Sequence, residues 1–454
     1  MRSYNDLIEI GDSDARRMDF IQLAIAEHKA TDAYKTALDA EQYMKTQNPT
    51  IMEYKKLLYT ISGEAVPDNY SANHKCASSF FKRFVTQENQ YLLGNGVTFA
   101  EESTKEKLGG EDFDVQMQKL GRDALVGGLA FAFANLDHID TFKLTEFVPL
   151  WDDEDGSLKA GIRFWQVAYN KPLRATLYEI DGYTEYIKRK DEDMQIFRAK
   201  TPYKVRVAKS VADGVYILDG QNYPTFPIVP LWGNPEHQSE LMTIRSQIDA
   251  YDLIKSGFAN DLDDASMIYW TISNAGGMDD VDLAKFVERM KTVKAAVVGD
   301  GISGGTTAEA HTMDVPYASR EAYLSRLEAD MYKDFMALNV EQIAAGQVTA
   351  TQIDAAYEPL NEKADMFEYC VNECIKGILT VFGIDDKPSF VRSKMSNVKE
   401  DIEALLAGAD YLSEDYITRK LLTLLGDVDL IEDVLSEKES ESMNRFAGGK
   451  DGNE

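Results

Sequence analysis

Apolar residues recur at helical spacing in two stretches near the middle of the chain. The first stretch places them at Ile244, Ile248, Tyr251, Ile254, Phe258 and Leu262. The second stretch places them at Tyr317, Leu324, Leu327, Met331, Phe335 and Leu338. This spacing lines one side of a helix with apolar side chains. We therefore predict two long helices, over residues 244–266 and 315–339, each roughly 30–38 Å long.

The segment between these helices, residues 267–314, has a different character. It contains a β-prone run at residues 267–272, a helical run at 279–294 and a glycine-rich turn at 299–305. These features predict a small α/β unit at the tip of the helix pair. Two helices with a small tip have too little core to stand alone, so we expect the pair to pack against copies of itself.

The first 243 residues predict helices followed by an antiparallel sheet. Helical patterns cover residues 14–48, a stretch beginning near residue 69, and residues 113–134. Residues 143–233 then alternate between polar and apolar, and four Asp-Gly pairs interrupt them, at residues 155, 181, 213 and 219. Asp-Gly between alternating stretches is a strong hairpin signal. The fold class predicted is α+β.

The chain after the second long helix begins with a small, polar stretch. Residues 340–351 have too few apolar side chains to bury a core, so we expect a loop facing water or a mobile ligand. A long helix is predicted over residues 352–382, within a segment that runs to residue 395. Short leucine-rich helices follow over 396–435, and we expect residues 436–454 to lack fixed structure.

Charge and motif content favour a structural role over catalysis. The chain carries 77 acidic against 48 basic residues, a formal net charge of -29, which disfavours tight binding to nucleic acid phosphates. The sequence contains no run of about 18 apolar residues, so we predict no membrane span. The three cysteines make no disulfide framework, and the five histidines are scattered. Because no motif for a nucleophile, a phosphate-binding loop or a zinc site is present, we predict no catalytic residues, no metal and no cofactor.

Several blocks, in this order, carry a family resemblance. They are the helix end Y-L-L-G-N at residues 91–95, G-R-D-A-L-V-G-G-L-A-F-A at 121–132, the hairpin around W-D-D-E-D-G at 151–156, F-P-I-V-P-L-W-G-N at 226–234 with the helix start that follows, and P-L-N-E-K-A at 359–364. Together they resemble the portal proteins of tailed double-stranded DNA bacteriophages, particularly long-tailed phages of Gram-positive hosts. The chain departs from the family at residues 344–351, where A-A-G-Q-V-T-A-T replaces the usual Ser-Gly-hydrophobic pattern.

The resemblance implies a portal-type fold with named parts. Residues 1–243 would form an α+β wing, joined by the long wing helix and connection at 352–395. The predicted helices 244–266 and 315–339 would form the stem, residues 267–314 the clip, 340–351 a tunnel loop and 396–435 a helical crown. Family members form a ring, usually of twelve subunits, at one capsid vertex, and they have no enzymatic activity.

The same resemblance implies partners and site residues. The ring would conduct double-stranded DNA without sequence specificity during packaging and ejection, and would contact the terminase large subunit, a head–tail adaptor, scaffolding protein and the major capsid protein. It would belong to the virion after synthesis in the host bacterial cytoplasm. The DNA-facing loop residues would be Glu341, Gln342, Gln347, Thr349 and Thr351. Stem packing would involve Ile248, Tyr251, Phe258, Leu262, Leu324, Leu327, Met331 and Phe335. The clip docking surface would include Glu288 and Lys291.

Two alternatives remain open from the sequence. Asp261, Asp263 and Asp264 are close enough in the sequence to suggest a metal-dependent nuclease, although a solvated helix face is the simpler interpretation. Another phage head–tail assembly protein, such as an adaptor, is also compatible with self-assembly. Adaptors are usually far shorter than 454 residues, so the length favours the portal interpretation.

Overall fold

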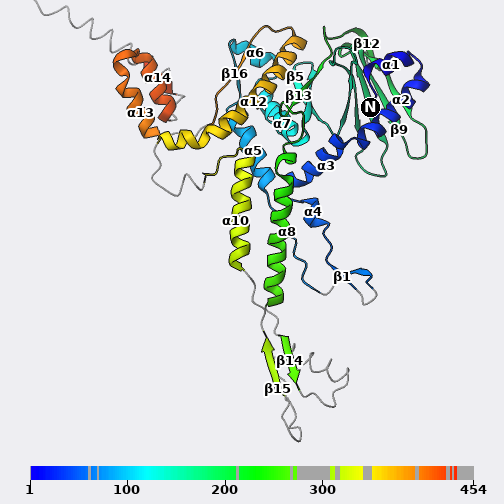
Figure 1. Cartoon of the computed structure of the whole chain (residues 1–454). Helices are drawn as coiled ribbons and strands as arrows, with labels where there is room; N and C mark the ends of the chain where they lie inside the picture. Colours follow the sequence, from blue (N-terminus) through cyan, green and yellow to red (C-terminus); the bar gives the residue numbers. More distant parts are fainter. Residues whose placement is uncertain are drawn as a thin grey trace, which may run out of the picture.

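The computed structural model describes residues 2–59, 63–68, 71–210, 214–265, 269–273, 307–311, 317–340, 350–393, 398–425, 430–431 and 434–436. Two long helices, α8 (Leu241–Ala265) and α10 (Tyr317–Asp334), lie side by side and project from a wider body of helices and strands (Figure 1). The body holds almost all of the buried core. The projecting pair contributes to this core mainly where it joins the body.

The N-terminal region contains four helices, and two of them, α2 and α3, lie where one long helix was predicted over residues 14–48. They are α1 (Tyr4–Ile10), α2 (Asp14–Ala30), α3 (Asp32–Met44) and α4 (Pro49–Met52). Thr31 separates α2 from α3 because its backbone is extended, with ψ of 150°, and its side chain caps α3 by accepting from the Tyr34 amide. The single-helix prediction was wrong for this local reason.

The second helix begins later than the sequence suggested. We predicted a start near residue 69, but α5 spans Phe80–Leu93, and residues 72–79 run as a non-helical segment along α8. Before this segment, β1 (Leu57–Tyr59) and β2 (Ala65–Pro67) pair antiparallel as a small hairpin. The hairpin projects from the body beside α8 (Figure 1).

The A-F-A-F run after the third predicted helix is a strand. Helix α7 (Glu111–Gly127) ends where Gly128 takes φ of 82°, a conformation that favours glycine. Strand β4 (Leu129–Asn135) follows and lies between β13 (Ile228–Trp232) and β5 (His138–Lys143). The helix predicted over 113–134 therefore ends seven residues early. The prediction extended the helix into β4 because a central strand can be apolar on both faces, and its apolar run then resembles a buried helix.

A five-stranded antiparallel sheet forms the largest β unit in the described residues. Its strands are ordered β10 (Gln195–Thr201), β9 (Gly182–Lys188), β8 (Leu173–Glu179), β7 (Leu158–Trp165) and β6 (Phe147–Trp151). Two predicted Asp-Gly turns lie between these strands, at Asp155-Gly156 and Asp181-Gly182.

A separate hairpin pairs β11 (Lys204–Ser210) with β12 (Gly214–Gln221). Asp219-Gly220 lies within β12, so the turn predicted there is wrong, and Asp213 is outside the described residues.

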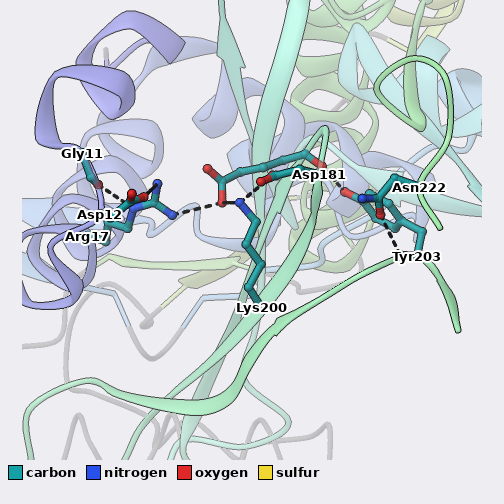
Figure 2. Close-up of polar contacts among 8 residues, drawn as sticks. Gly11, Asp12, Arg17, Asp181, Lys200, Tyr203 and Asn222 are labelled. Atoms are coloured by element: carbon teal, nitrogen blue, oxygen red, sulfur yellow. Dashed lines mark hydrogen bonds and ion pairs between the residues drawn. The ribbon is translucent and has the colours of Figure 1, made fainter. Parts of the chain in front are cut away.

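Ion pairs join the sheet to the N-terminal helices. Arg17 on α2 donates to Glu179 Oε2 at 3.1 Å, and Lys200 Nζ lies 3.0 Å from the same oxygen and 2.5 Å from Asp181 (Figure 2). Tyr203 donates its hydroxyl to the Glu179 carbonyl oxygen at 2.6 Å. The Lys200 charge is thus paired with two carboxylates within the chain.

The C-terminal part returns to the body and then leaves it. Helix α6 (Glu102–Lys107) follows β3 (Val97–Phe99), which pairs with β16 (Pro388–Phe390). Helix α12 (Ala350–Phe382) matches the long helix predicted over 352–382, with Cys374 buried and Cys370 half-buried in its packed face. Helices α13 (Val398–Ala407) and α14 (Glu414–Leu425) extend from the body (Figure 1). Among the described helices, none has the length and apolar run needed to cross a bilayer.

Candidate functional site: the two-helix stem

We refer to α8 and α10 as the stem. Both predicted stem helices are confirmed as helices, with α8 starting three residues earlier than expected. Helix α10 ends at Asp334 rather than near residue 339. There Met336 takes a positive φ of 60° and the Ala337 amide donates back to the Tyr332 carbonyl oxygen at 2.9 Å, which closes the last turn.

Burial along the stem falls from the body toward the tip. Near the body, Ile244, Ile248, Met331 and Phe335 are at most 1% exposed, and Phe84 of α5 lies 5.0 Å from Phe335 between ring centroids. Further along, Tyr251, Phe258, Leu324 and Leu327 are half-buried. At the far end Leu262 and Tyr317 are 54% and 64% exposed. Of the residues predicted to pack in the stem, Leu262 thus packs least within a single chain.

A second face of α8 is polar, yet it is buried. Asp252, Ser256 and Asn260, spaced one turn apart, are 0%, 2% and 8% exposed. They accept hydrogen bonds from the backbone amides of Ser78 at 2.8 Å, Cys76 at 2.9 Å and His74 at 2.6 Å. Asn48 also donates to Asp252. We call these three pairings the polar ladder, and they hold residues 73–79 in an extended path along the helix.

The polar ladder explains why the helix predicted from residue 69 does not form there. The amides of residues 74, 76 and 78 donate to α8 rather than to carbonyl oxygens one turn back. Burial raises the pKa of Asp252, although the hydrogen bonds from Ser78 and Asn48 oppose this effect. The spacing of short polar residues at 252, 256 and 260 was the signal that the sequence reasoning missed.

The aspartates weighed as a nuclease site have other partners. Asp261 pairs with Arg320 of α10, and Asp263 lies 2.5 Å from His74 Nε2. Asp264 lies on the same helix, near its end. In the described parts of the chain, no group of three His, Cys, Asp or Glu residues could hold a metal ion.

A buried lysine joins the stem to the body. Lys363 of α12 places its Nζ 2.6 Å from Glu240 Oε2, 3.4 Å from Glu88 Oε2 and 3.2 Å from the centre of the Phe335 ring. It also donates to the Phe335 carbonyl oxygen at 3.1 Å, at the end of α10. We call this set the lysine junction. It connects α5, α10, α12 and the residue before α8.

The lysine junction holds two acids around one base. Glu88 is 1% exposed, and burial raises its pKa to about 8 despite the opposing effect of Lys363. Asn234 donates to the other oxygen of Glu240 at 2.7 Å. With its pKa raised in this way, the Glu88 carboxyl holds a proton near neutral pH. The sequence signal for the lysine junction was Glu88, a charged residue within the apolar face of α5.

Helix α5 also anchors both ends of the segment predicted as a tunnel loop. Gln87 and the Leu338 backbone exchange two hydrogen bonds of 3.0 Å, just before the segment. After it, Tyr357 of α12 stacks on Tyr91 with ring centroids 5.7 Å apart. Thr351 is exposed in the first turn of α12, so the helix begins before the predicted end of the loop.

The remaining predicted site residues lie outside the described residues. These are Glu341, Gln342, Gln347 and Thr349 in the loop, and Glu288 and Lys291 beyond the far end of the stem. At that end β14 (Tyr269–Ser273) pairs antiparallel with β15 (Thr307–His311). The β-prone run at 267–272 is thus confirmed as a strand.

Comparison with known families decides the identity of the chain. Residues 23–442 match the family described as phage portal protein, SPP1 Gp6-like. The chain belongs to this portal protein family. It therefore has the α+β portal fold and is a structural component of a phage virion, not an enzyme. The nuclease alternative is set aside on this ground.

Two individual portal proteins are similar to this chain at low sequence identity. The portal protein of Bacillus phage SPP1 is 24% identical over 425 residues, covering 86% of this chain and 79% of that protein. The portal protein of Clostridium phage phiCD119 is 29% identical over 196 residues. That match covers 41% of this chain and 43% of the Clostridium phage protein, so the chain is matched over less than half of that relative's length.

Solved structures of similar shape come from gene transfer agent particles. One is the neck of a native particle computed with C12 symmetry, with 11% identity and a TM-score of 0.39, covering 76% of this chain and 89% of that chain. Another is the neck of an empty particle computed with C6 symmetry, with 11% identity and a TM-score of 0.42, covering 76% and 90%.

Proposed function

We propose that copies of this chain assemble side by side into a ring at one capsid vertex, twelve in number as is usual for the portal proteins it resembles. The stems line a central tunnel through which double-stranded DNA enters during packaging and leaves during ejection. The observation that carries this proposal, beside family membership, is the exposed apolar surface on the far half of the stem, including Leu253, Leu262 and Tyr323. A lone chain leaves this surface in water, whereas a ring buries it.

The charge of the chain supports a conduit rather than a DNA clamp. With a formal net charge of -29 per subunit, a ring repels phosphates on average, so DNA meets no wall that holds it tightly. The segment at 341–349 carries one charged residue, Glu341, and the polar residues Gln342, Gln347 and Thr349. We assign these four residues and Thr351 to weak contacts with the DNA that have no sequence specificity.

The tip beyond the stem is the docking platform in this proposal. Residues 267–314, with Glu288 and Lys291 on the surface, receive the terminase large subunit during packaging and a head–tail adaptor afterwards. Scaffolding protein and the major capsid protein surround the body during assembly. Synthesis takes place in the host bacterial cytoplasm, before incorporation into the virion.

The decisive experiment is the mass and shape of the purified chain. Size-exclusion chromatography with light scattering should give an assembly near twelve times 50.9 kDa, about 610 kDa, and negative-stain images should show rings with a central hole. A species that stays monomeric at every protein and salt concentration, and also in the presence of scaffolding protein, would contradict the proposal.

A further inference from the structure

The stem carries a groove that no described residue of its own chain fills. A cavity of about 310 Å³ lies between α8 and α10, lined by Ile254, Gly257, Ser319, Arg320 and Tyr323. Gly257 forms part of its α8 side, and a Cβ built at this glycine meets no atom within 4 Å. Glycine inside a helix costs about 0.5–1 kcal/mol relative to alanine. Among the described residues, none approaches this position closely enough to require glycine, so the space is open to a group from outside the chain.

The β1–β2 hairpin has the opposite property, since it carries apolar side chains without a place to bury them. Leu57, Leu58 and Val66 are 46%, 44% and 40% exposed. Leu57 and Leu58 point to opposite faces of the ribbon because side chains alternate along a strand. An isolated two-stranded hairpin is marginally stable in water, so it needs a surface to pack on.

The hairpin and the groove lie on different faces of the same helix. The hairpin leads into residues 73–79, which the polar ladder holds on the face of α8 marked by Ser256. At 3.6 residues per turn, Gly257 and Ile254 lie roughly 100° and 160° around the helix from Ser256. The hairpin is thus fixed on one face of α8, and the groove lies on another. This arrangement suits a head-to-tail contact between neighbouring subunits, which is the kind of contact that closes a ring.

Reach and charge both fit a neighbouring stem. Five residues lie between Met52, the end of α4, and Leu58, and six residue steps can span at most about 20 Å. Packed helices are about 8–10 Å apart, so this length is sufficient for the hairpin to contact a neighbouring stem. On the groove side of α8, Asp261 follows Gly257 by about one turn, and Arg320 of α10 pairs with it. Lys55, exposed at the base of the hairpin, brings the complementary charge.

We propose that the β1–β2 hairpin of one subunit docks on the stem of the next, with an apolar side chain from Leu57, Leu58 or Val66 in the groove at Gly257. The proposal rests on the ring of the proposed function and adds a strap that links adjacent stems. The basic base of the hairpin sets its orientation, because an exposed ion pair contributes more to orientation than to affinity.

Cysteine cross-linking in assembled rings tests this contact. In full-length chain carrying Cys76→Ser and Cys370→Ala, Gly257→Cys is combined separately with Leu57→Cys, Leu58→Cys or Val66→Cys, and the rings are treated with a short bis-maleimide. We expect a ladder of covalent dimers, trimers and larger species on a denaturing gel, from one of Leu57 and Leu58 rather than both. Gly257→Cys with Val115→Cys, a site on α7 that is 61% exposed and so at least as accessible to the reagent, is the control and should remain monomeric on the gel.

The outcomes distinguish a failure of the proposed strap from a failure of ring assembly. Rings that form but give no ladder from any of the three pairs overturn the strap and leave the ring intact. An internally cross-linked monomer also overturns it, because the hairpin would then reach its own groove. The absence of any ring overturns the proposed function and the strap with it.

A second pair of variants identifies the occupant of the groove. Gly257→Ala should leave the monomer as stable as the parent, while Gly257→Leu fills the groove and should reduce the ring yield several-fold. If Gly257→Leu blocks rings but no hairpin cysteine cross-links, another part of the neighbour fills the groove and the strap is wrong. If Gly257→Leu leaves rings intact but alters DNA packaging, the groove faces the tunnel and the strap is again wrong.

Discussion

At the scale of single residues, Lys363 is the side chain on which the structure depends most. Without Lys363, the buried Glu240 loses its cation partner at 2.6 Å, and breaking a buried ion pair in this way costs about 3–5 kcal/mol. We expect Lys363→Met to lower the free energy of unfolding by this amount, measured by urea denaturation of the unassembled chain. A change below about 1 kcal/mol would show that Glu240 and Glu88 do not depend on Lys363.

Glu88 supplies a pH test of the same cluster. Its pKa is raised from about 4.5 unfolded to about 8 folded, so the folded state binds the extra proton and loses stability as pH rises between these values. Glu88→Gln removes this titration. The variant should match the parent near pH 5 and exceed it increasingly toward pH 9 in denaturation experiments. Parallel pH profiles for the two proteins would contradict the buried, protonated state of Glu88.

At the scale of elements, the polar ladder makes α8 the support of an extended segment. Asp252→Leu removes the acceptor of the Ser78 amide and of the Asn48 side chain, so we expect a loss of about 1–3 kcal/mol. Hydrogen exchange should quicken at the amides of residues 74–78, with the far side of α8 unaffected. Asp252→Asn keeps one acceptor oxygen and is the matched control. Unchanged exchange in Asp252→Leu would remove the ladder as the reason for the extended path.

The two ends of α8 should respond differently to the same substitution. Ile248 is fully buried in the core of its own chain, so Ile248→Asp should destabilise the monomer by several kcal/mol. Phe258 is half-buried, so Phe258→Asp should leave the monomer's melting temperature near the parental value while lowering ring yield. Melting curves and size-exclusion chromatography measure the two effects. Equal loss of monomer stability in both variants would contradict the burial gradient along the stem.

Sequence reasoning found elements wherever one period dominated. The stem helices and α12 follow from periodicity, and two of the four hairpins of the five-stranded sheet follow from Asp-Gly turns. Periodicity failed where a local contact set the backbone conformation. Thr31 caps a new helix, and Gly128 permits a turn into β4. Within residues 72–79, the amides of residues 74, 76 and 78 pair with α8 and not with one another. The lysine junction joins residues from distant parts of the chain, and periodicity alone cannot show that they meet.

At the scale of the whole molecule, the segment at 341–349 is where the proposed ring meets DNA. Replacing Gln342 and Gln347 with lysine adds two positive charges per subunit, so rings should form normally while DNA is retained more strongly at low salt than at high salt. In vitro packaging across a salt series measures this effect, and Gln342→Asn with Gln347→Asn is the neutral control. Packaging that matches the parent at low salt would place DNA elsewhere.

The lysine junction also decides how the molecule carries mechanical load. A pull along α10 arrives at the Phe335 carbonyl oxygen and ring, where Lys363 couples it to α5 and α12 together. Separating buried charges before water can reach them is costly from the first fraction of an ångström, so the joint is stiff and yields abruptly rather than gradually. The residues that flank the segment at 341–349 contact α5 on both sides, close to the lysine junction. We therefore expect a pull on the stem to act first on the residues that flank that segment.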